Sequence, residues 1–416
     1  MSRPRFRSLT AVAVGVVLPA ILLTGCSGGS SPSSSPASSN SSSAATSGAS
    51  ASSGPGSNSS SAAQSGAGPS NDAPTLAQLL KGNEGTPPTS SPPAATGKSI
   101  WWISCGQQAE SCAQFAAAGK DAAEALGWEF HLADGNLNNA NGYATAMRTA
   151  LAAHPDAIVQ DAFSCSTDQP ELQQAKQQGV AVIGLETTDC SDAGNGPSLF
   201  TVPMIYSDTY PDNKAWWTGW GQVSAEFIAA DSGGTAKVIT AHGQGDPQFD
   251  FLKAGFQDVM AKCSGCSVVA EVPWTTADLA PNGAWVTALR NALVQHPDAT
   301  YVWWPFDTNA VLSGGAKTVL QSGSKAKVVS GLGTGPALDL IRSGQLYAEG
   351  VARSDAWLSW AAIDQLNRHF NNQPSAPQGL GFVAIDSTHN MPAQTGANYQ
   401  TPVDFKALYK KAWGVG

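Results

Sequence analysis

The sequence predicts an α/β protein with two doubly wound parallel-sheet lobes, joined by a hinge, with a ligand cleft between them. The residues Arg148–Ala157 (RTALAAHPDA) recur as Arg290–Ala299 (RNALVQHPDA), with seven of the ten positions identical. Each copy ends a helical pattern at a His-Pro pair, where a helix cannot continue, and leads into an apolar strand pattern. Strand and helix patterns alternate around both copies, which is typical of parallel sheets. The alternative is that one favourable turn sequence occurs twice by chance.

The N-terminus indicates export. Three arginines precede an apolar stretch at residues 9–23, so residues 1–25 have the parts of a signal peptide. The stretch is short for a span of a bilayer and contains Pro19. The sequence Leu23-Thr24-Gly25-Cys26 resembles a bacterial lipobox. This resemblance implies that Cys26 carries a lipid such as palmitate and anchors the mature protein to the membrane.

Residues 26–97 are expected to form a tether. Ser, Ala, Gly and Pro dominate this segment, which has too few large apolar residues to offset the entropy of ordering. The short apolar run at residues 75–81 is interpreted as a transient helix, and docking onto the folded region is the alternative.

The folded region divides into residues 98–212 with 354–385 as the first lobe and residues 213–353 with 386–416 as the second. Apolar runs define the strands, and helices begin at capping signals such as Ser111 with Gln114 and end at Gly127, Gly179 or the two His-Pro pairs. The expected strands are 99–104, 128–133, 157–160, 180–185, 237–241, 267–272, 300–304, 326–330 and 345–351. The expected helices are 111–126, 142–153, 170–178, 214–230, 249–262, 283–295, 308–321, 337–343 and 357–370, followed by an irregular tail.

Charge and cysteine content narrow the function classes. A net charge of −9 without a Lys/Arg run argues against nucleic acid as a partner. Six cysteines remain after Cys26, and in an oxidising compartment an even number suggests disulfides, for which fifteen pairings exist. Proximity in the expected layout favours Cys105–Cys112, Cys165–Cys190 and Cys263–Cys266. The last pair has redox spacing, but it follows a helix and lacks the helix N-terminus that lowers a thiol pKa.

Three local motifs, in this order and spacing, resemble the sugar-binding branch of ABC-transporter solute-binding lipoproteins. They are Gly179–Ile183 (GVAVI), Lys253–Phe256 (KAGF) and Asp307–Ala310 (DTNA) after Trp303-Trp304. The resemblance covers about residues 98–370 and implies a type I periplasmic-binding-protein fold. It further implies that the helix 357–370 returns to the first lobe and that the tail crosses again.

Several positions depart from that branch. Residues 248–251 replace an Arg that often precedes the Gly-Phe, Phe306 stands where Asn is usual, and residues 331–334 lack a usual Asp. Arg353 stands near the position of a usual Gln. The resemblance therefore implies the fold more firmly than it implies a sugar ligand.

Ligands of open parallel sheets bind outside the carboxyl ends of the strands, so the strand-end loops supply the candidates. Asp307 is the preferred candidate. For three others a structural role is the alternative to ligand binding: capping of the following turn for Asp161, an ion pair with Asp355 for Arg353, and packing within its loop for His242. Trp274 and Phe306 either form a flat surface for a ligand or belong to the core. The candidate ligand-binding set is Gln107, Gln108, Asp161, Phe163, Glu186, His242, Gln244, Trp274, Phe306, Asp307, Thr334 and Arg353.

The sequence therefore predicts a monomeric, non-enzymatic protein that captures a small polar ligand and delivers it to an ABC-transporter permease. No esterase elbow, zinc-protease motif or P-loop occurs, and Gly331-x-Gly333-x-Gly335 lacks the third glycine of a dinucleotide turn at its spacing. We expect no metal and no cofactor. The alternatives are a sensor that presents its closed form to a signalling partner, and an extracytoplasmic enzyme.

Overall fold

The first lobe is built on a parallel sheet of four strands. The structure is a computed structural model that describes residues 73–416. The sheet has the order β2-β1-β3-β4, and all its pairs are parallel. Every residue of β3 and β4 is buried, because helices cover both faces of the sheet. The strands are β1 (Ser99–Ser104), β2 (Glu129–Asp134), β3 (Ala157–Asp161) and β4 (Ala181–Leu185).

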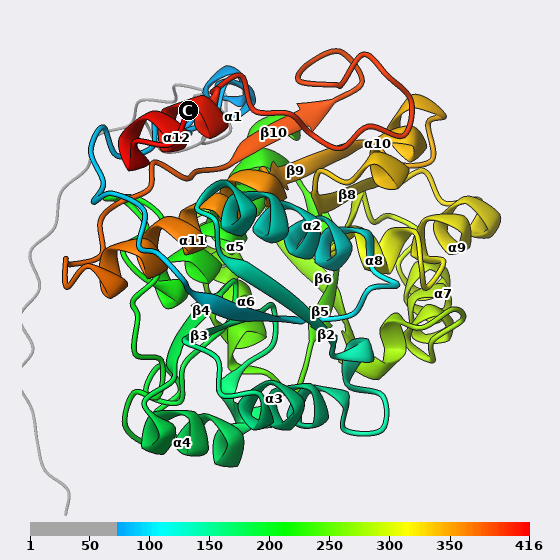
Figure 1. The fold of residues 1–416 in the computed structure, drawn as a ribbon. Helices are drawn as coiled ribbons and strands as arrows, with labels where there is room; N and C mark the ends of the chain where they lie inside the picture. Colours follow the sequence, from blue (N-terminus) through cyan, green and yellow to red (C-terminus); the bar gives the residue numbers. More distant parts are fainter. Residues whose placement is uncertain (1–72) are drawn as a thin grey trace, which may run out of the picture. The chain divides into compact units, whose positions relative to one another are not determined.

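Two pairs of helices enclose this sheet. Helices α2 (Glu110–Ala125) and α11 (Asp355–Phe370) pack side by side on one face, and α3 (Gly142–Ala152) and α4 (Gln169–Gln178) lie on the other (Figure 1). The long helix near the C-terminus thus belongs to the first lobe, as the family resemblance implies.

The second lobe is built on a sheet of six strands in the order β10-β9-β8-β7-β5-β6. Helices α5 and α6 pack on each other, and α7 packs on α9. The strands are β5 (Lys237–Gly243), β6 (Ser267–Trp274), β7 (Tyr301–Trp303), β8 (Lys327–Leu332), β9 (Ala348–Ala352) and β10 (Val383–Asp386). The helices are α5 (Asn213–Asp231), α6 (Pro247–Lys262), α7 (Trp285–Gln295), α8 (Asp307–Ala310), α9 (Gly315–Ser322) and α10 (Gly335–Arg342). Short 3-10 helices of the chain are η1 (Asn136–Asn138), η2 (Cys165–Thr167) and η3 (Thr276–Leu279).

The repeated sequence occupies equivalent places in the two lobes. Its first copy joins α3 to β3, and its second joins α7 to β7. The order β2-β1-β3-β4 in the first sheet corresponds to β6-β5-β7-β8 in the second, with β3 and β7 at matching positions. The prediction of two α/β lobes with parallel sheets is confirmed.

Two differences from the predicted helices bear on the loops at the strand ends. The helix expected over 308–321 is divided into α8 and α9, because Gly314 adopts a φ of +85° that an L-residue rarely takes. Helix α2 begins at Glu110, and its N-cap residue, Ala109, provides no side-chain hydrogen bond. Ser111 therefore does not cap this helix, and its hydroxyl is directed elsewhere.

The end of the expected tether is instead part of the folded domain. Thr75 and Gln78 form a capping box for α1 (Leu76–Lys81), which packs on β10 and α5 with Leu79 buried. Further along, the Asn83 amide donates to Phe382 O at 3.0 Å, and Trp128 Nε1 donates to Ala95 O at 2.7 Å. Residues 75–95, called the strap below, thus contact elements of both lobes.

The C-terminal region also differs from the predicted lobe boundaries. Residues 383–385 were expected in the first lobe, but β10 pairs antiparallel with β9 in the second sheet. The tail was expected to be irregular and to stay in the second lobe. It contains α12 (Phe405–Trp413), which packs on α11, and Trp413 Nε1 donates to Asp364 Oδ1 at 2.8 Å.

The structure contains the three disulfides that the sequence analysis favours, Cys105–Cys112, Cys165–Cys190 and Cys263–Cys266. The predicted signal peptide, Cys26 and most of the predicted tether lie outside the described residues. Within residues 73–416, no helix is both long and apolar enough to span a membrane.

Candidate functional site

A pocket of about 160 Å³ lies between the strand-end loops of the two lobes. One water needs roughly 10–15 Å³ of such space, so the pocket has room for a small organic molecule. The start of α2 forms its first-lobe wall, and the starts of α8 and α10 form its second-lobe wall. It is lined by Gln108, Ala109, Glu110, Ser111, Asp307, Thr308, Val311, Leu312, Thr334 and Pro336.

Asp307 is a buried carboxylate that holds two strand ends of the second lobe together. It accepts hydrogen bonds from Ser330 Oγ at 2.8 Å and from the Thr334 amide and hydroxyl at 2.9 and 2.7 Å. Burial raises the pKa of Asp307, while these donors and the neighbouring Glu349 oppose the rise. Three donors on one carboxylate indicate the ionised form. Asp307 thus fixes Thr334 at the pocket wall.

Glu349 completes a buried acidic pair with Asp307. It is fully buried, and neither of its oxygens has a hydrogen-bond donor among the described residues. Burial and the charge of Asp307 raise the pKa of Glu349 well above its usual range. We therefore assign the ionised form to Asp307 and the protonated form to Glu349.

Arg353 lies at the end of β9 and is bound on all sides by the protein. Its Nε and Nη2 form a bidentate pair with Glu186, at 2.8 and 2.5 Å. Its Nη1 donates to Asp355 at 2.5 Å and to Leu332 O at 3.2 Å, and Nη2 also approaches Ser111 Oγ at 3.3 Å. These contacts use all five N–H donors of the guanidinium. Arg353 therefore links the two lobes and has no donor left for a ligand.

Glu186 is likewise fully engaged. It follows β4, adopts a φ of +48°, and is 2% exposed. Besides the Arg353 pair, it accepts from Trp216 Nε1 at 3.0 Å, and its amide donates to Tyr206 Oη at 2.8 Å. The prediction that Glu186 and Arg353 contact the ligand directly finds no support in this geometry. Arg353 instead forms the ion pair with Asp355 that was its alternative role.

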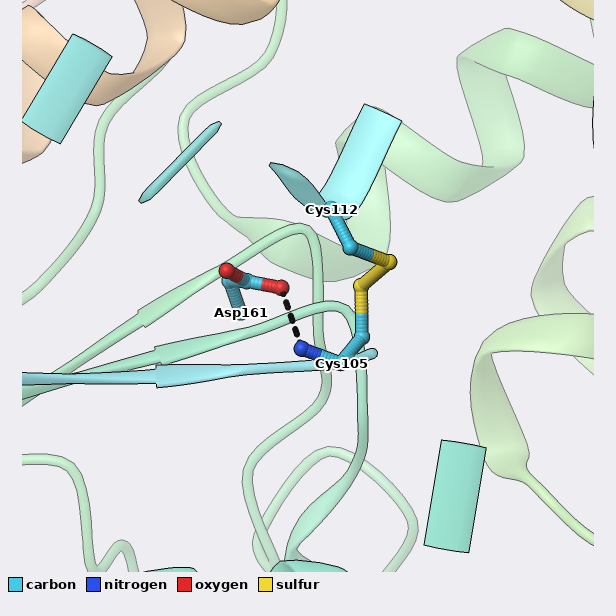
Figure 2. Close-up of side chains that lie close together, drawn as sticks. All are labelled: Cys105, Cys112 and Asp161. Atoms are coloured by element: carbon cyan, nitrogen blue, oxygen red, sulfur yellow. Dashed lines mark hydrogen bonds between the residues drawn. A yellow bond between two sulfur atoms is a disulfide. The ribbon is translucent and has the colours of Figure 1, made fainter. Parts of the chain in front are cut away.

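Asp161 supports the loop after β1 rather than lining the pocket. Figure 2 shows its carboxylate directed toward the Cys105 amide, which donates to it at 2.9 Å beside the Cys105–Cys112 disulfide. Trp102 Nε1 also donates to this carboxylate. Burial raises the pKa of Asp161 to about 8. Asp161 thus fixes the loop that leads into α2 and the pocket wall.

Two groups of side chains within residues 73–416 have the spacing of metal ligands. They are Asp161 with Cys105 and Cys112, and Asp189 with Cys165 and Cys190. In both groups the sulfurs form a disulfide and carry no thiolate charge, so neither group offers a metal site.

The remaining candidates lie around the pocket or away from it. Phe306, half-buried, packs near Trp217, Trp220, Phe249 and Trp274 with ring centroids 5.9 to 6.1 Å apart. Trp274 is 1% exposed and belongs to this aromatic cluster.

Four further candidates do not line the pocket between the lobes. Gln107 Nε2 donates to Ser104, and Phe163 stacks on Tyr143. His242 lines a separate small pocket on the second lobe, and the exposed Gln244 hydrogen-bonds to Trp274 through its backbone.

Of the twelve candidates, the structure brings Gln108, Asp307 and Thr334 together at the pocket. Sequence reasoning missed Glu110, Ser111 and Thr308, which lie in the first turns of α2 and α8. The signal that would have found them is the strand-end rule extended by one helical turn, because helices begin directly after those loops.

Comparison with known proteins agrees with this architecture. A family model described as "Periplasmic binding protein domain" matches residues 100–374. The chain belongs to this family. No curated protein sequence is significantly similar to this periplasmic binding protein.

Solved structures give the same fold at low sequence identity. A glucose-galactose binding protein from Geobacillus stearothermophilus is 16% identical with a TM-score of 0.58, covering 70% of this chain and 98% of that one. A solute-binding protein from Burkholderia graminis in complex with D-arabinose is 18% identical with a TM-score of 0.58, covering 73% and 99%. An ABC-transporter solute-binding protein from Agrobacterium vitis with bound allitol is 19% identical with a TM-score of 0.56, covering 70% and 96%. The type I periplasmic-binding-protein fold implied by the sequence resemblance is confirmed.

Proposed function

We propose that this periplasmic binding protein captures a small polar, sugar-like solute between its lobes and delivers it to an ABC-transporter permease. The observation that carries the proposal is the pocket between the start of α2 and the starts of α8 and α10. A ligand there contacts both lobes at once, so it stabilises the closed arrangement relative to an open one. The allitol and D-arabinose bound in two of the similar structures support this ligand class.

We further propose that the protein works at the extracytoplasmic face of the membrane, held there by lipid on Cys26. The arginine-rich N-terminus, the apolar stretch and the lipobox-like sequence before Cys26 support this. Metabolic labelling with a palmitate analogue tests it, because Cys26→Ser then abolishes incorporation. Unchanged labelling of that variant would exclude Cys26 as the anchor.

Calorimetry with the mature chain tests the capture function against a panel of pentoses, hexoses and polyols. We expect saturable binding of at least one member, and mass spectrometry should recover that ligand unchanged, as a binding protein rather than an enzyme requires. Saturable binding by no member would refute the proposal.

Asp307→Asn tests the site within the same experiment. It removes the charge that holds Thr334 at the pocket wall, so affinity should fall at least about tenfold, the equivalent of one charge-assisted hydrogen bond. Asp258→Asn is the matched control, because Asp258 is an exposed partner of Lys262 on α6. Equal affinities of the two variants would place the ligand elsewhere.

A further inference from the structure

The pocket wall carries negative charge and no cation. Among its lining residues, Glu110 and Asp307 are carboxylates, and Lys, Arg and His are absent. The nearby Arg353 has all five donors engaged by Glu186, Asp355, Leu332 O and Ser111. A ligand carboxylate or phosphate would therefore meet two acids and no available guanidinium.

Helix N-termini at the wall do not change this balance. Helices α2 and α8 both begin there, and their first amides carry partial positive charge. Each has an acidic residue in its first turn, Glu110 in α2 and Asp307 in α8. Helix α10 also begins at the wall and has no acidic residue in its first turn. Its first amides are nevertheless engaged, because the Thr334 amide donates to Asp307, the Gly335 amide donates to Asn398 Oδ1, and Pro336 has no N–H. The positive ends are thus already occupied by the chain itself.

A second observation concerns the buried acid behind the wall. Glu349 is fully buried beside Asp307, and burial together with the charge of Asp307 favours its protonated form. Asp307 keeps the negative charge of the pair and lines the pocket, so positive charge bound there is within reach of its electrostatic field. Hydroxyls of Ser111, Thr308 and Thr334 complete a wall that can accept hydrogen bonds from several ligand groups.

We infer that the pocket selects small polyhydroxy compounds that are uncharged or carry an amine, prefers the amine-bearing ones, and excludes sugar acids and sugar phosphates. This inference rests on the proposed capture function and adds the charge class of the ligand. Hydroxyl and ammonium groups supply the donors that the carboxylates can accept, whereas an anion would be desolvated against like charge.

Matched probes that differ in one group test the inference by calorimetry with the mature chain. One triplet is glucose, glucosamine and glucuronate, and the other is glycerol, 3-amino-1,2-propanediol and glycerate. In each triplet we expect the amine to bind at least as tightly as the neutral compound, and the acid at least tenfold more weakly. Tightest binding by the acid would overturn the charge assignment while supporting capture. Binding by none of the six, with none in the wider sugar panel, would overturn both.

Charge reversal at the pocket wall provides the second test. Glu110→Lys should move the preference between glucosamine and glucuronate toward the acid by about threefold or more, a typical size for one exposed charge. Glu124→Lys changes the net charge equally on the same helix, but Glu124 lies near the far end of α2 beside Lys120. The Glu124→Lys variant should keep the preference between glucosamine and glucuronate that the unaltered protein has. Equal shifts in both variants would show a general charge effect and overturn the assignment to Glu110.

Discussion

Arg353 illustrates how a single residue acquires its role from its surroundings. Its sequence position, at the end of a strand, suits either a ligand anion or an ion pair. In the structure the guanidinium lies between Phe115 and Trp220, 5.3 and 5.1 Å from their ring centroids, and bonds to Glu186 and Asp355. Because Glu186 follows β4 and Arg353 follows β9, the pair ties the hinge ends of the two lobes together.

Arg353→Met should therefore destabilise the protein strongly. Removal of one partner leaves Glu186 and Asp355 buried without their cation, which typically costs about 3–5 kcal/mol. Urea denaturation measures the loss. Lys262→Met is the control, since Lys262 pairs with Asp258 on the surface and should contribute only about 0.3–0.5 kcal/mol. A loss below about 1 kcal/mol for the Arg353 variant would show that the pair does not stabilise the fold.

At the level of the single residue, sequence patterns predicted only part of the wall of the candidate pocket. Asp307 and Thr334 follow strand ends, and that rule needs no tertiary information. Whether Arg353 or Glu186 remains free for a ligand depends on contacts between segments more than 160 positions apart. No local pattern contains those contacts, so both residues were predicted as ligand contacts.

At the level of elements, periodicity predicted the alternating strands and helices but not the strap. Residues 82–97 are rich in Pro, Ser, Thr and Gly and lack an apolar period. Polar side chains of α11 hold this segment: Asp364 accepts from Ser91 Oγ at 2.6 Å, and Asn367 bonds to Ala95 and Pro92 at 2.9 Å. Order there comes from hydrogen bonds supplied by a distant helix, which composition does not reveal.

The strap should stabilise the fold, in contrast to the tether before it. We expect deletion of residues 27–72 from the mature chain to leave the Tm within about 1 °C. Deletion of residues 27–95 exposes the surface under Leu79. It also removes the strap groups that hydrogen-bond to side chains of α11, so the Tm should fall by about 5 °C or more. Differential scanning calorimetry distinguishes the two. Equal Tm values for both deletions would show that the strap is only a continuation of the tether.

At the scale of the whole molecule, acidic groups of the two lobes lie close together at the interface between the lobes. Ser164 Oγ of the first lobe donates to Gln248 Oε1 of the second at 3.1 Å. Asp246, just before α6, is held in the same interface near Ser164, Ser166, Asp168 and Tyr143. Burial raises the pKa of Asp246 to about 6, although the two serines oppose the rise. The folded protein thus holds a proton there at pH values between about 4 and 6, where an ordinary aspartate releases it.

This pKa shift predicts the sign of a pH dependence. The pKa of Asp246 in the folded protein lies above the ordinary value of 3.8. Protonation of Asp246 therefore contributes fully to the free energy of unfolding below pH 3.8, and this contribution is lost as the pH rises through about 6. Between pH 4 and pH 8 the unaltered protein should lose about 2 kcal/mol of unfolding free energy relative to Asp246→Asn, whose amide does not titrate. The raised pKa values of Asp161 and Asp355 act in the same direction but are common to both proteins and cancel in the difference. Asp250→Asn, which removes an exposed acid from the same helix, should follow the unaltered protein at every pH. Parallel curves for Asp246→Asn and the unaltered protein would show that Asp246 keeps an ordinary pKa in the folded protein.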